Sequence, residues 1–119
     1  MSVTSPTEPQ RASEALAALE RYRTHVTQLA GHWMDADLYH TVAQDLDEVR
    51  ARCQALPQLS GPWVALLIAH AELVHGLWQV TRQDPADRAA GHQRLLARVQ
   101  ASAQALAAVC MKIAAPEAR

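Results

Sequence analysis

The six histidines are the side chains of this chain best suited to chemistry, because imidazole binds metals and exchanges protons near neutral pH. In the four-helix bundle that the sequence predicts, His25, His75 and His92 all fall about seven to eight residues from the same end of the bundle. Three imidazoles at one level could hold zinc or copper. However, His25 lies on the flank of its helix and His75 on a polar face, so both would have to lean into one groove. A metal- or small-ligand-binding sensor is therefore the alternative hypothesis.

Two acidic residues each precede a histidine by three positions, in the pairs Glu72/His75 and Asp37/His40. Di-iron bundles use this spacing, since residues three apart on a helix can reach one metal. Here both pairs lie about 150° to 180° from the apolar centre of their helices. We expect them at the surface.

Patterns typical of catalysis are missing from the chain. No Ser/His/Asp or Cys/His order is recognisable, glycine is too scarce for a phosphate-binding loop, and no Cys-x-x-Cys-His occurs. The two cysteines, Cys53 and Cys110, are expected to be small buried apolar residues. We therefore expect no cofactor and lean toward a protein that is not an enzyme.

Apolar residues recur in alternating steps of three and four, which is the pattern of core-facing helices. No segment alternates with a period of two, so strands are not expected. The pattern predicts helices over residues 12–33, 36–56, 62–83 and 85–114.

Caps and breakers set these boundaries. Gly31 and Asp35 indicate a turn between the first two helices, although one long bent helix remains an alternative. Pro57 ends the second helix, Pro62 follows a capping Ser60, and Pro85 follows a capping Asp84.

Four helices joined by short connections predict an all-α, antiparallel up-down-up-down four-helix bundle, in which each helix packs against two neighbours. Residues 11–115 would form this single domain. Residues 1–10, rich in Pro and Thr, are expected to be a disordered tail.

The helix at 62–83 has an apolar arc of about 200°, wider than one-sided packing needs. It is either the most enclosed helix or carries a second interface. Val64 and Trp78 lie on one shoulder of the arc, and Leu73 and Val80 on the other. A shoulder left exposed would be an association surface, for which Trp63, Val64 and Trp78 are the candidate residues.

His70 lies in the middle of that arc, where a buried imidazole needs a hydrogen-bond partner. Tyr22 on the first helix falls in the same layer of the bundle. We expect the two side chains to be neighbours.

Composition limits the partners. Eleven Lys and Arg residues against twelve Asp and Glu residues leave no basic surface for nucleic acid.

Residues 63–80 are interrupted by polar side chains and are not expected to span a membrane. The start of the chain has no signal-peptide pattern, which favours a cytoplasmic location, and the bias toward Arg and Ala is typical of GC-rich bacterial coding sequences. The leading hypothesis is a protein-binding bundle that forms a homodimer or binds another protein.

Overall fold

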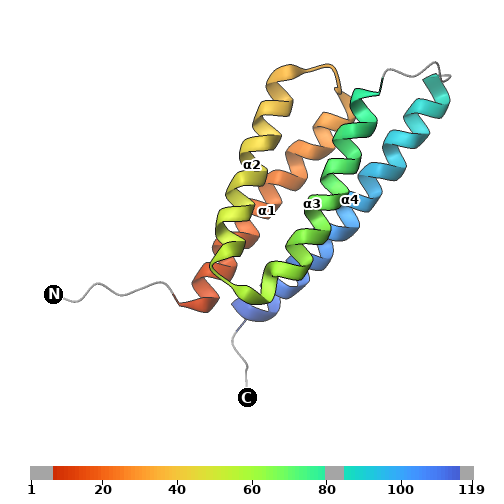
Figure 1. Cartoon of the computed structure of the whole chain (residues 1–119). Helices are drawn as coiled ribbons and strands as arrows, with labels where there is room; N and C mark the ends of the chain where they lie inside the picture. Colours follow the sequence, from red (N-terminus) through yellow and green to blue (C-terminus); the bar gives the residue numbers. More distant parts are fainter. Residues whose placement is uncertain (1–6, 80–84, 116–119) are drawn as a thin grey trace.

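Four α-helices make up the computed structural model, which describes residues 7–79 and 85–115 (Figure 1). They are α1 (Glu8–Gly31), α2 (Ala36–Gln54), α3 (Ser60–Trp78) and α4 (Pro85–Ala114), and a short 3-10 turn, η1 (Pro57–Leu59), precedes α3. No strand occurs in the described ranges. The predicted all-α four-helix fold is confirmed, and the helices run alternately up and down (Figure 1).

Helix α1 begins at Glu8 and not near residue 12, because Thr7 and Gln10 form a capping box. The Thr7 hydroxyl accepts a hydrogen bond from the Gln10 backbone N–H at 3.2 Å, and the Gln10 side chain accepts one from the Thr7 N–H at 2.8 Å. Residues 7–10 of the expected tail thus belong to the helix and its cap. Residues 1–6 lie outside the described residues.

The first two helices are separate, which resolves the alternative of one bent helix. The Asp35 side chain accepts a hydrogen bond from the Leu38 N–H at 3.2 Å and caps α2. Helix α3 ends at Trp78, before the expected residue 83, because Gln79 already has an extended backbone. Residues 80–84, which include Val80, lie outside the described residues.

Helices α1 and α4 form the centre of the bundle. Helix α1 packs against α2 and α4, and α4 packs against α1 and α3, whereas α2 and α3 make only sparse contact. The expectation that every helix has two full neighbours therefore holds for α1 and α4 and fails for α2 and α3. The bundle is open along one of its four sides.

Bulky residues lie at both ends of this open side. Leu56 and Leu59, in the connection between the two helices, are fully buried and occupy core space at one end. At the other end the rings of Tyr39 and Trp78 lie between the helices, with centroids 5.3 Å apart.

Within the described part of the chain, no helix combines the length and the apolar character that crossing a bilayer requires.

Candidate functional site

The outer face of α3 exposes large apolar side chains. Val64 is 49% exposed, Leu67 40%, Ile68 55% and Trp78 66%. Counted at about 100° per residue, these four positions span an arc of about 100° with the exposed Ala71 at its centre. We call these five residues the outer face of α3. The opposite side of the helix carries its buried core residues, Leu66, Ala69, Leu73 and Leu77.

The three predicted interface residues do not lie in equivalent surroundings. Val64 and Trp78 are exposed on the outer face, whereas Trp63 is half-buried and packs against the core. Leu67 and Ile68 join Val64 and Trp78, although they were not among the predicted site residues. Their spacing of three and four residues from Val64 is the sequence signal that could have identified them.

The outer face has no Asp, Glu, Lys or Arg, and the exposed His75 lies within the same arc. Glu72 is the only Asp, Glu, Lys or Arg in α3, and it points away from this face to form an ion pair with Arg98 of α4 at 3.0 Å. The surface is therefore suited to an apolar partner and not to a strongly charged one.

A small hollow adjoins the outer face at Trp78. It has a volume of about 260 Å³ and lies where the turn between α1 and α2 meets the end of α3. Met34, 81% exposed, lies on its rim. The hollow could accept one apolar side chain, because all its lining residues are apolar or aromatic: Trp33, Met34, Ala36, Tyr39, Leu77 and Trp78.

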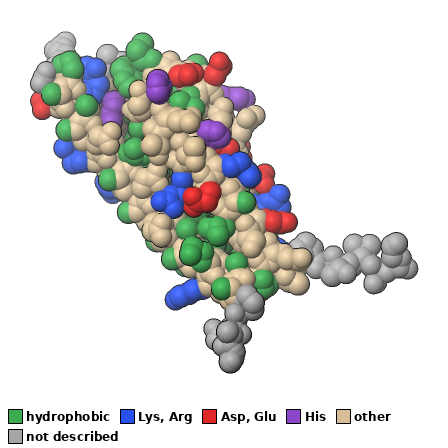
Figure 2. All heavy atoms as spheres, turned by 180° about the vertical axis from the view of Figure 1, so that it is seen from behind, with side chains coloured by type: hydrophobic (Ala, Val, Ile, Leu, Met, Phe, Trp, Pro, Cys, Tyr) green, Lys and Arg blue, Asp and Glu red, His purple; other side chains and the backbone are tan. Residues whose placement is uncertain are grey.

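The three histidines of the sensor hypothesis have separate neighbours. His25 is paired with Asp45 of α2, and His75 is exposed and shares a hydrogen bond with Gln79 at 3.0 Å. His92 is buried and lies edge-on to Trp33, with ring centroids 6.2 Å apart. Seen from behind, histidine side chains occupy the upper half of the molecule but are spread over it (Figure 2). Among the described residues no three His, Cys, Asp or Glu side chains are grouped as metal ligands.

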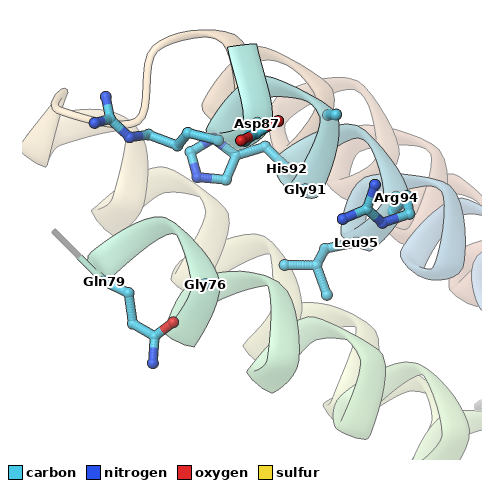
Figure 3. A pocket seen from close by; sticks show the side chains of 9 residues that line it. Gly76, Gln79, Asp87, Gly91, His92, Arg94 and Leu95 are labelled. Carbon is cyan, nitrogen blue, oxygen red and sulfur yellow. The ribbon is translucent and has the colours of Figure 1, made fainter. Parts of the chain in front are cut away.

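His92 lines an open hollow of about 380 Å³ between α3 and α4. His92 and Leu95 reach from α4 toward α3, whereas Gln79 points away (Figure 3). Burial lowers the pKa of His92, and the charge of Arg88 lowers it further, against the opposite effect of the Gly76 backbone. The imidazole is therefore neutral at pH 7, and it could accept or donate one hydrogen bond to a ligand in the hollow.

His70 and Tyr22 are neighbours, as the sequence predicted, and form a part-buried hydrogen bond. The Tyr22 hydroxyl lies 2.8 Å from His70 Nδ1. Burial raises the pKa of Tyr22 and lowers that of His70, so both are neutral and the phenol donates to the imidazole. The pair satisfies two polar groups of the core.

The remaining residues with chemical potential lie in unreactive surroundings. His75, Asp37 and His40 are exposed, as expected, and Glu72 is half-exposed in its ion pair. Both cysteines are buried and free, and burial raises the pKa of the Cys53 thiol to about 12. This thiol is a poor nucleophile because it stays protonated.

Comparison of the chain with models of known protein families, with curated proteins and with solved structures finds no match.

Proposed function

We propose that this chain is a non-enzymatic protein that works by binding protein through the outer face of α3, and that it does so as a homodimer. The observation that carries the proposal is the alignment of Val64, Leu67, Ile68 and Trp78, all exposed, along one face of one helix. Single exposed apolar residues are common, but a contiguous group on an uncharged face is typical of an association surface.

The open side of the bundle supports this proposal. Helix α3 has one full neighbour, α4, and makes only sparse contact with α2. Helix α3 has apolar residues on its core side and on its outer face, so contact with a second helix would bury apolar surface that α4 leaves exposed. Trp78 should contribute most, since Trp is enriched among residues that dominate binding energy.

Sedimentation velocity over a range of micromolar concentrations tests the proposal. Wild-type protein should dimerise, and Ile68→Glu should shift it to a monomer that keeps the helical content of the wild type. Ala65→Glu is the matched control, because Ala65 is exposed on α3 outside the outer face. Trp78→Ala should weaken the dimer at least tenfold, or by about 1.4 kcal/mol. A wild-type monomer at every concentration would contradict the proposal.

A second candidate function, binding of a small ligand at the His92 end, is favoured by one observation. His92 is buried yet lines two hollows, one toward Gly76 and one toward Trp33. Native mass spectrometry of the protein as purified should then show added mass that His92→Gln loses. A spectrum with no mass beyond the chain, in monomer or dimer, would count against this candidate.

A further inference from the structure

We infer that two copies of the chain pair through α3 in antiparallel orientation, with a two-fold axis passing beside Ala71. The inference rests on the proposed function and adds the arrangement of the dimer.

Along the helix, the two end residues of the outer face lie at equal distances from Ala71. Val64 lies seven residues before Ala71 and Trp78 seven residues after it. In an antiparallel pair around this point, Trp78 of one copy faces Val64 of the second, and the two Ala71 residues meet. A parallel pair would instead place Trp78 on Trp78 and Val64 on Val64, which is too crowded at one end and too empty at the other.

Around the helix, the flanking residues match in the same way. Leu67 and Val74 lie on the side of the arc nearer α2, and Ile68 and His75 on the other side, at about 100° per residue. The two-fold operation brings Leu67 against Val74 of the second copy and Ile68 against His75. Ala71 at the centre has the smallest side chain of the face, which allows the helix axes to approach to about 8 Å.

Charge favours a second copy over a strongly acidic or basic partner. Glu72, the only Asp, Glu, Lys or Arg of α3, lies outside the outer face and pairs with Arg98 of α4. The chain as a whole carries a net charge of −1, so two copies repel each other weakly. The antiparallel arrangement also sets the two α3 dipoles in opposite directions, which is the favourable orientation.

The hollow beside Trp78 lies at one end of the α3–α3 pair, where it could receive a side chain of the second copy. Its volume of about 260 Å³ is adjacent to the ring that Val64 of the second copy would cover. The four exposed apolar residues offer roughly 450 Å² per copy, within the range of functional patches. Two such patches with their flanking residues reach about 1,000 Å², the lower limit of specific interfaces. A reversible dimer with micromolar affinity is the expected consequence.

Disulfide trapping of single-cysteine variants tests the arrangement. Oxidised Ala71→Cys should give a covalent dimer on a non-reducing gel, because the two Cα atoms at the axis can come within disulfide range. The wild type and the control Ala65→Cys should remain uncrosslinked, since Cys53 and Cys110 are buried and Ala65 lies outside the outer face. Val64→Cys alone should also remain uncrosslinked, because only a parallel pair brings the two copies of this residue together.

Mixing two variants checks the register. Leu67→Cys mixed with Val74→Cys should give a mixed disulfide, identified by its mass, in excess over either homodimer. Strong self-crosslinking of Val64→Cys would overturn the antiparallel arrangement. If wild-type protein sediments as a dimer but Ala71→Cys does not crosslink, the arrangement is wrong while the proposed function stands. If wild-type protein is monomeric throughout, both fail.

Discussion

The side of the bundle between α1 and α4 is closed, and the side between α2 and α3 is open. Helix α1 buries four alanines and α4 two, and their small side chains allow close approach. Between α2 and α3 stand the rings of Tyr39 and Trp78, and beyond them lies an exposed apolar face. The difference teaches that the two helices with the most buried residues, α1 and α4, pack against each other, whereas α3 keeps part of its apolar surface exposed.

The two sides of the bundle also differ in their polar contacts. On the closed side, the Gln100 side chain accepts a hydrogen bond from Arg23 Nε at 2.9 Å and donates one to the Thr27 hydroxyl at 2.7 Å. Polar groups rim the closed contact between α1 and α4. On α3 the outer face has no comparable charged rim, so its apolar residues remain available to a partner.

The largest expected effect contrasts a core residue with an outer-face residue. Leu106→Ala should lower the free energy of unfolding by about 2 to 5 kcal/mol, because Leu106 is fully buried. Ile68→Ala should cost less than about 0.5 kcal/mol in the monomer. Denaturant unfolding at low protein concentration measures both. An Ile68→Ala cost close to that of Leu106→Ala would mean that the outer face belongs to the core.

A smaller effect is expected from Tyr22→Phe, which removes the hydroxyl that donates to His70. Loss of a buried hydrogen bond should lower the free energy of unfolding by about 0.5 to 1.5 kcal/mol. Tyr39→Phe is the matched control, because Tyr39 is only partly buried, and it should be nearly neutral in the same unfolding assay. Equal costs for the two substitutions would show that the phenol of Tyr22 gains nothing from His70.

The polar link on the closed side should contribute less. Gln100→Ala removes contacts to both Arg23 and Thr27 and should cost about 0.5 to 1 kcal/mol, since the site is part-buried. Gln104→Ala removes one exposed contact to Arg23 at 3.1 Å and should cost less. Thermal melting of the two variants gives the comparison. If Gln104→Ala lowered the melting temperature more than Gln100→Ala, the exposed contact between Gln104 and Arg23 would be the more important one.

The pH dependence is the finest test. Burial lowers the pKa of both His70 and His92 below the usual value of 6.5. The unfolded chain therefore binds more protons in the window just below pH 6.5, and stability is lost as pH falls through that window. Urea unfolding between pH 7 and pH 5 should show this slope, and the double variant His70→Gln/His92→Gln should flatten it. A slope that survives in the double variant would have to come from other groups.

Several local features were predictable from sequence because their causes are local. Pro85 marked the start of α4, the apolar steps carried it to its observed end, and Asp35 marked the start of α2. The Tyr22–His70 contact also followed from counting layers along α1 and α3, which run in the same direction from the same end of the bundle. The Thr7–Gln10 capping box was present in the sequence but was overlooked among the prolines of the first residues.

The arrangement of the candidate site was less predictable, because it depends on distances between helices. An apolar arc on α3 was evident, but periodicity alone could not say which shoulder stays exposed. Leu73 is buried on one shoulder, whereas Val64 and Trp78 are exposed on the other. Likewise His25, His75 and His92 share a level along the bundle, yet each points to a different neighbour.

The sequence by itself determined the helices, their order and the excess of apolar surface on α3, since these depend on residue type and spacing within one segment. Only the tertiary structure decided that α2 and α3 stay apart. Leu56 and Leu59 are buried at one end of that separation, and the rings of Tyr39 and Trp78 meet at the other. Volume between elements is a property of the packed molecule and is not encoded in the period of any one helix.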